Sequence, residues 1–194
     1  MSKSDSHTPQ NERNKTIRWV ITIFFVTILV SGIISFTSDL LMANSTMLMA
    51  YIILFAIVLV GIIFDVIGVA VTSADERPFH SMAARKVTGA LEAIRLLRNA
   101  ERVSSICNDV VGDICGVVSG SASATIAAQI LKNFEFSAEN LIPLLMSALV
   151  AGLTVGGKAI GKTFAMNSCT KIVHGVGKIL WACQHWPKKI KNRK

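Results

Sequence analysis

The sequence predicts an all-α membrane protein with about four transmembrane helices and an amphipathic juxtamembrane helix. Hydrophobic residues make up 52% of the chain and charged residues only 16%, and long apolar runs recur along it. A soluble domain usually carries about a quarter charged residues, and the mean hydropathy here is +0.53. The net charge of +8 comes from basic residues that flank the apolar runs. This charge therefore indicates membrane orientation, and we expect membrane lipid but no nucleic acid as a partner.

The first predicted span covers residues 17–36. This apolar run is long enough for about 30 Å of hydrocarbon, and Arg18 and Trp19 place an interfacial cation and aromatic ring at its start. The polar residues 1–15 predict a disordered cytoplasmic tail. A cleaved signal peptide is the alternative, but the run is long for one and no clear small-residue cleavage site follows it. We therefore expect residues 16–46 to form an uncleaved transmembrane helix and its loop.

A second apolar run and an amphipathic helix follow. The run covers residues 47–72 and only Asp65 interrupts it, while a break near Pro78 separates it from residues 79–99. Residues 79–99 alternate apolar and basic positions at helical spacing, which is typical of a helix lying at the membrane surface. A soluble helical hairpin would look similar, but it has no large core nearby to cover. The basic residues expected to contact lipid headgroups are Arg85, Lys86, Arg95 and Arg98.

The third predicted span, residues 103–131, begins with two carboxylates in an apolar sequence. Asp109 and Asp113 are four residues apart, so they share one face of a helix, and Asn108 lies beside them. An acidic residue inside a spanning segment is expensive to bury and therefore suggests a functional site. The alternative, which the sequence leaves open, is that both carboxylates lie near the interface and meet only water or a lysine.

The fourth predicted span, residues 141–165, contains several glycines in its second half, which predict a break or tight packing. A weakly amphipathic stretch and a basic cytoplasmic tail, residues 187–194, follow it. With four spans, every Lys and Arg except Lys132 falls on one side of the membrane. The positive-inside rule then predicts a multi-pass protein of the cell membrane with both termini in the cytoplasm.

Four segments of the chain, taken in order, resemble the motifs of one known family. Residues 64–76 are similar to F-S-x-x-E-T-A-L-x-S-x-S-R, and residues 93–102 to R-x-L-x-L-L-x-N-P-E-R. Residues 106–112 match I-G-N-N-x-x-N, and residues 157–165 resemble G-E-x-x-P-K-x-x-A. The transmembrane domain of the CNNM/CorC family of magnesium transport proteins has these motifs in this order, and residues 47–186 resemble it. The family continues into cytosolic CBS and CorC-type domains, so the resemblance implies a divergent member that lacks them.

The resemblance implies a homodimeric cation transporter that binds Mg2+. In the family, a dehydrated magnesium ion lies among Ser hydroxyls, the Asn of the I-G-N-N motif and backbone carbonyls. Carried over to this chain, Ser73 and Asn108 are the expected ligands, with Thr72 and Asp109 as neighbours. Such ligands suit magnesium, which prefers an octahedron of hard oxygen atoms at about 2.1 Å.

The chain departs from the family motifs at positions that matter for an ion. Gly68 stands in place of the acidic residue of the first motif, and Lys158 and Gly161 stand in place of the Glu and the Pro of the last. A lysine near the site would repel a divalent cation. It could instead pair with Asp109 or Asp113 inside the membrane, where an unpaired charge is costly.

Two functions follow from these observations. The first is transport or binding of a divalent cation, magnesium first, at the ligands named above. The second is a non-transporting scaffold or regulator that kept the fold, lost the ion site and acts on another membrane or cytosolic protein. We do not expect an enzyme, because no catalytic motif occurs and His80, His174 and His185 are scattered.

Overall fold

The computed structural model describes residues 9–43, 46–133 and 141–191, and within these ranges the chain is helical and contains no strand. Four helical segments of these ranges are long and apolar enough to cross a membrane. The predicted fold class, an all-α membrane protein with four spans, is thereby confirmed. The elements, in chain order, are α1 (Pro9–Ala43), α2 (Met47–Ser73), α3 (Arg77–Ala84), α4 (Ala90–Arg98), α5 (Ala100–Ser105), the π-helix η1 (Ile106–Gly112), α6 (Asp113–Asn133) and α7 (Leu141–Lys191).

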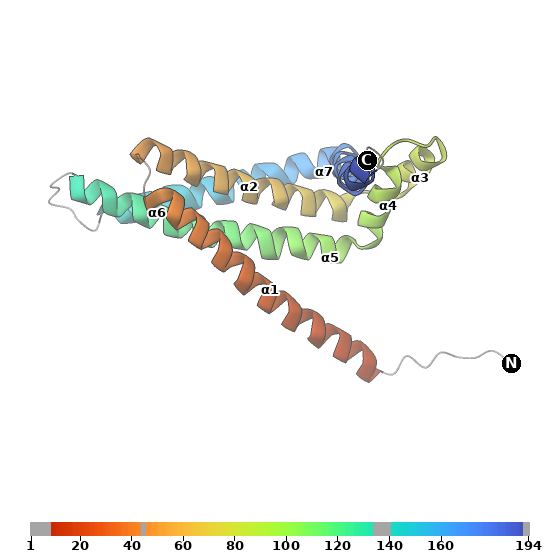
Figure 1. The fold of residues 1–194 in the computed structure, drawn as a ribbon, viewed down its shortest axis with the longest axis horizontal. Coiled ribbons are helices and arrows are strands. Elements are labelled where there is room, and N and C mark those ends of the chain that lie inside the picture. The colour runs from red at the N-terminus through yellow and green to blue at the C-terminus, as the bar shows by residue number, and fades with distance from the viewer. Residues whose placement is uncertain (1–8, 44–45, 134–140, 192–194) are drawn as a thin grey trace.

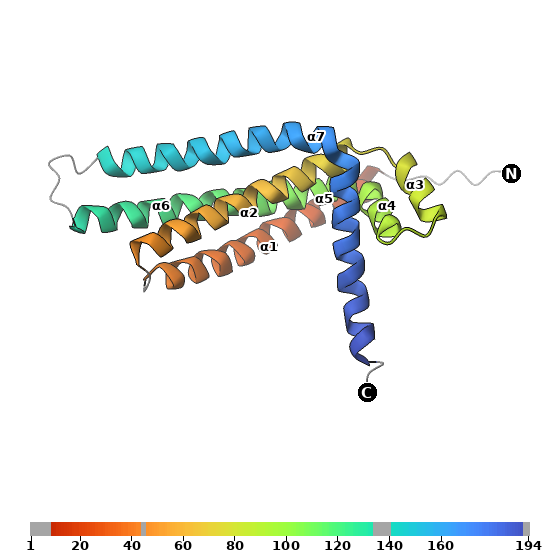
Figure 2. The same cartoon turned by 90° about the horizontal axis from the view of Figure 1, so that it is seen from above.

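Three of the spans run side by side, and α1 crosses them at an angle. Figure 1 shows α2, the continuous stretch of α5 and α6, and the first half of α7 as one bundle, from which the start of α1 diverges. Figure 2 shows that α7 turns sharply, so that its second half points away from the bundle. The turn lies at Ser168, whose backbone is not helical (φ −124°, ψ 19°). The first half of α7 is therefore the fourth span.

The central helix is α2, which contacts α7, α6, η1 and α5. Gly61 of α2 lies against α6, and Gly157 and Gly161 of α7 lie against α2, in each case so closely that a Cβ atom would collide with a neighbouring side chain. Small residues of this kind let helix backbones approach one another inside a membrane. Gly157 and Gly161 of the fourth span therefore serve close packing, and the helix bends further along, at Ser168.

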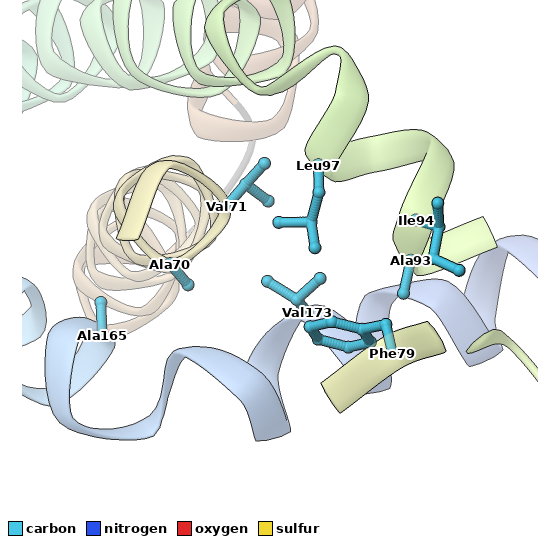
Figure 3. Close-up of a cluster of buried hydrophobic side chains, with 8 residues drawn as sticks. All are labelled: Ala70, Val71, Phe79, Ala93, Ile94, Leu97, Ala165 and Val173. Carbon is cyan, nitrogen blue, oxygen red and sulfur yellow. The ribbon is translucent and has the colours of Figure 1, made fainter. Parts of the chain in front are cut away.

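A cluster of buried apolar side chains joins the end of α2 to α3, α4 and α7 (Figure 3). Phe79 of α3 is fully buried there and is the largest fully buried side chain of the described residues. Because the cluster draws on both sides of the bend in α7, it fixes the amphipathic segment to the bundle. Its members are Ala70, Val71, Phe79, Ala93, Ile94, Leu97, Ala165 and Val173.

The amphipathic segment forms two short helices, α3 and α4, where a single helix over residues 79–99 was predicted. Lys86 (φ 56°) and Gly89 (φ 83°), in the turn between them, adopt the left-handed conformation. This conformation cannot continue a right-handed helix. Both short helices have the apolar face that the sequence pattern predicted, so the pattern alone could not show the turn. The basic residues predicted to meet lipid headgroups, Arg85, Lys86, Arg95 and Arg98, are all exposed.

The described ends of the chain are more helical than predicted. α1 begins at Pro9, inside the stretch 1–15 that was expected to be a disordered tail. Its first residues include Gln, Glu, Arg and Lys, which are good helix formers and extend the first span outward. Part of the predicted basic tail, residues 187–191, belongs to α7. Residues 1–8 and 192–194 lie outside the described ranges.

Candidate functional site

The candidate site begins with a carboxylate in the most apolar span. Asp65 of α2 is 5% exposed, and its span has a mean hydropathy of 3.0. The Nζ atom of Lys158, on α7, lies 3.7 Å from Asp65 Oδ1. A charge inside a membrane is costly unless an opposite charge accompanies it. Each of these two side chains therefore supplies the counter-charge that the other needs.

Gly112, the last residue of η1, leaves room for this ion pair. A Cβ atom at Gly112 would lie 3.3 Å from Lys158 Nζ, 3.4 Å from the carbonyl oxygen of Cys107 and 4.0 Å from Asp65 Oδ1. The lysine ammonium is thus close to both the carboxylate and the backbone of η1. Any larger residue at this position would crowd the ammonium.

Asn108 brings a second polar group to α2 from the π-helix. Its Nδ2 atom donates a hydrogen bond to Ser104 Oγ at 3.2 Å, whereas its Oδ1 atom is buried and has no hydrogen-bond partner. This oxygen lies directly against Gly68, where a Cβ atom would collide with it. A π-helix has a wider turn than an α-helix and is frequently found at functional sites. Asn108 therefore packs against Gly68, the position at which the resembled motif has an acidic residue.

Asp65 also carries a buried oxygen, Oδ2, that has no hydrogen-bond partner. Because Asp65 and Gly68 are three residues apart on α2, they share one face of the helix. Oδ2 of Asp65 and Oδ1 of Asn108 thus lie on the same side of α2. Buried acceptors without a partner are uncommon and cost free energy. The Asp65 cluster, by which we mean Asp65, Asn108, Gly112 and Lys158, can therefore accept a cation or a hydrogen-bond donor such as water.

Of the predicted metal ligands, Asn108 belongs to the Asp65 cluster. The Thr72 hydroxyl donates to the carbonyl oxygen of Val69 in its own helix, at 3.0 Å, and Ser73 is exposed at the end of α2. Asp109 is exposed on η1. In the part of the chain that the structure describes, no group of three or more His, Cys, Asp or Glu side chains is placed to hold a metal ion.

Lys158 pairs with Asp65, where the sequence had offered Asp109 or Asp113 as possible partners. Both of those carboxylates are exposed, as in the alternative in which they lie near the interface. On the third span, it is Gly112 that lies beside the ammonium.

Sequence reasoning missed Asp65, although a signal was present. Asp65 is the sole charged residue in residues 47–72. A single charge in an apolar span requires an opposite charge on another span, and Lys158 was a candidate for it. The sequence does not give the rotation of each helix about its axis, so it could not distinguish Asp65 from Asp109 and Asp113.

The fold and the Asp65 cluster define the class of this protein as a multi-pass α-helical membrane protein with an ion pair among its spans. Comparisons with family models, with characterised proteins and with solved structures gave no match. The resemblance to CNNM/CorC motifs therefore stays a prediction.

Proposed function

We propose that this protein binds a cation at the Asp65 cluster and moves it across the membrane, with magnesium as the first candidate. One observation carries the proposal: Asp65 Oδ2 and Asn108 Oδ1 are buried oxygens without hydrogen-bond partners among membrane-spanning helices. Carboxylate and amide oxygens are hard ligands of the kind that magnesium prefers. Asp65 also supplies the negative charge that a cation requires at this depth.

The residues that the motif resemblance implied have a place in this proposal. Asn108 is a ligand, as expected. Thr72 and Ser73 lie at or beside the end of α2, and Asp109 follows Asn108 on η1. We place these three on the route between the cluster and the cytoplasmic side, where their exposed oxygens meet a hydrated ion. The protein acts as a homodimer in the cell membrane, with both termini in the cytoplasm.

A second function, a non-transporting membrane scaffold or regulatory partner, is favoured by a different observation. Lys158 already compensates the charge of Asp65. In this alternative the ion pair only joins α2 to α7, and a water molecule satisfies the two buried oxygens. The protein would then act through contacts with another membrane or cytosolic protein, while Arg85, Lys86, Arg95 and Arg98 contact anionic headgroups.

The test is the thermal stability of the detergent-purified protein in magnesium, manganese, calcium or sodium chloride. A ligand that binds only the folded state stabilises it by about 2.7 kcal/mol at a hundred times its dissociation constant. We expect a selective rise of the melting temperature with magnesium, and uptake of magnesium into liposomes that contain the protein. Asp65→Asn should abolish both effects, whereas Asp113→Asn, at an exposed position outside the cluster, should retain them.

The absence of any stabilisation by these cations, together with no flux, would contradict the transport proposal. A folded membrane protein that neither binds nor transports these cations would fit the scaffold function. Pull-downs from solubilised membranes would then be the next experiment.

A further inference from the structure

We propose that the ammonium of Lys158 is a built-in competitor at the Asp65 cluster, so that a free cation binds there only when it displaces the ammonium. This inference concerns the same site as the proposed function, but it can stand or fall separately from it. It makes Lys158 the residue that determines how tightly the site holds a cation.

The ammonium of Lys158 is held by its ion pair with Asp65. The distance of 3.7 Å from Lys158 Nζ to Asp65 Oδ1 is that of an ion pair and is too long for a hydrogen bond. The lysine side chain is 23% exposed, whereas that of Asp65 is 6% exposed. A lysine ammonium stands on a flexible stem of four carbons. The ammonium is therefore attracted by charge, not fixed by hydrogen bonds, and its flexible stem allows it to move.

The neighbours of the ammonium also favour its exchange for a free cation. The ammonium lies beside the carboxylate of Asp65 and the backbone of η1 at Gly112. The other carboxylate oxygen of Asp65 and Oδ1 of Asn108 remain without partners. Asp65 and Asn108 thus offer two buried oxygens that the lysine, paired at one oxygen, does not use.

The balance of charge between Asp65, Lys158 and an entering cation favours the exchange as well. Asp65 and Lys158 together are neutral. A free cation that entered while the ammonium stayed would leave a net positive charge among the spans, which is costly in hydrocarbon. Displacement of the ammonium removes this net charge for sodium and lowers it from +2 to +1 for magnesium. Binding and withdrawal of Lys158 are therefore one exchange, and every cation competes with the lysine for Asp65.

The test removes the ammonium and asks whether a free cation replaces it. Lys158→Met, of similar length and without charge, is purified and melted in choline chloride and in magnesium or sodium chloride of equal ionic strength. We expect it to be less stable than the wild type in choline, and to be stabilised by magnesium or sodium with an apparent affinity at least tenfold higher than that of the wild type. Lys162→Met is the matched control, because Lys162 is an exposed lysine one turn along α7, and it should respond as the wild type does.

The double variant Asp65→Asn with Lys158→Met removes the charge that attracts the cation, so its stability should not depend on which cation is present. A Lys158→Met protein that gains no more from magnesium or sodium than the wild type does would overturn the inference. Lys158→Gln serves as a second uncharged variant. If neither variant can be recovered in magnesium or sodium chloride, a free cation cannot replace the ammonium and the inference is also overturned.

The outcomes separate this inference from the proposed function. A wild type that binds magnesium, with Lys158→Met binding it no more tightly, would reject the competition and keep the transport proposal. If no cation stabilises the wild type but magnesium or sodium stabilises Lys158→Met, the result would support competition by the ammonium. It would at the same time show that the wild-type site, with its lysine in place, does not bind a free cation.

Discussion

At the scale of single residues, an unpaired charge costs much more free energy inside a membrane than in water. Removing one partner of a buried ion pair typically costs about 3–5 kcal/mol, because it leaves the other charge uncompensated, whereas replacing both partners with apolar residues is often neutral. The Asp65–Lys158 pair is therefore weak evidence for stability by itself. The two buried oxygens beside it are the stronger sign of function, because packing alone gives no reason to leave them unpaired.

Gly68 offers a direct test of the contact between α2 and η1. A Cβ atom at this position would collide with Asn108 Oδ1. We expect Gly68→Ala to displace Asn108, to lower the free energy of unfolding by about 1–3 kcal/mol as overpacking does, and to weaken any stabilisation by magnesium. Melting in detergent, with and without magnesium chloride, measures both effects.

Gly152→Ala is the control for this substitution. Gly152 lies in a span on α7, and nothing lies within 4 Å of the position where its Cβ would be. Alanine is favoured over glycine within a helix by about 0.5–1 kcal/mol. The control should therefore be as stable as the wild type or slightly more so. Equal losses in both variants would mean that the contact with Asn108 is unimportant.

The residues of the site were only partly predictable. Asn108 was found because its motif resembles one that binds an ion, and Lys158 because it stands where the resembled motif has a glutamate. Their pairing was not predictable, because it depends on how each helix is rotated about its axis. In η1 the wide π-turn changes this rotation, so α-helical spacing alone could not tell which residue of the third span would lie beside Lys158.

At the scale of elements, the least predictable feature is how α4 lies on the second half of α7. Gly89 has a positive φ, and a Cβ atom there would lie 2.6 Å from the backbone nitrogen of Lys178. Gly177, in turn, faces the carbonyl oxygen of Gly89 and the backbone of Ala93. The two helices therefore meet backbone to backbone. The sequence shows two glycines almost ninety positions apart and gives no sign that they touch.

We expect Gly89→Ala to loosen this contact. A left-handed conformation costs a residue other than glycine about 1–3 kcal/mol, and the backbone of α7 cannot yield as a flexible side chain could. The melting temperature should fall, and the segment of α3 and α4 should become more sensitive to a protease. Gly175→Ala, where the added Cβ meets nothing within 4 Å, should leave both measurements unchanged, and a similar fall in the two variants would contradict the assigned contact.

Elements with a strong periodic or apolar signal were predicted well, and their interruptions were not. The four spans follow from hydropathy and length. The turn between α3 and α4 depends partly on a positive φ at Lys86, which is not a residue that signals such a conformation. The bend in α7 lies at Ser168 and not at the glycines of the span, two of which, Gly157 and Gly161, instead pack against α2.

At the scale of the whole molecule, the surface fits a lipid environment. Phe24 and Phe25 of α1 are 60% and 64% exposed, which water would disfavour and hydrocarbon accepts. A groove of about 700 Å3 between α2 and α7 is likewise lined mainly by apolar side chains. Composition alone predicted this placement, because so apolar a chain leaves large hydrophobic surfaces uncovered whatever the details of its packing.

The orientation in the membrane can be tested with two cysteines on opposite sides. With four spans, the Lys and Arg residues outside the spans or at their ends lie on one side, except Lys132, and the positive-inside rule places that side in the cytoplasm. Cys183, which is exposed on the second half of α7, should then react with a membrane-impermeant maleimide only after the cells are permeabilised. A cysteine at the exposed position between α1 and α2, introduced as Thr46→Cys in a Cys183→Ser background, should react in intact cells. The reverse pattern would place the basic helices outside. Labelling of both positions from one side would reject the four-span topology, since three spans separate the two positions along the chain.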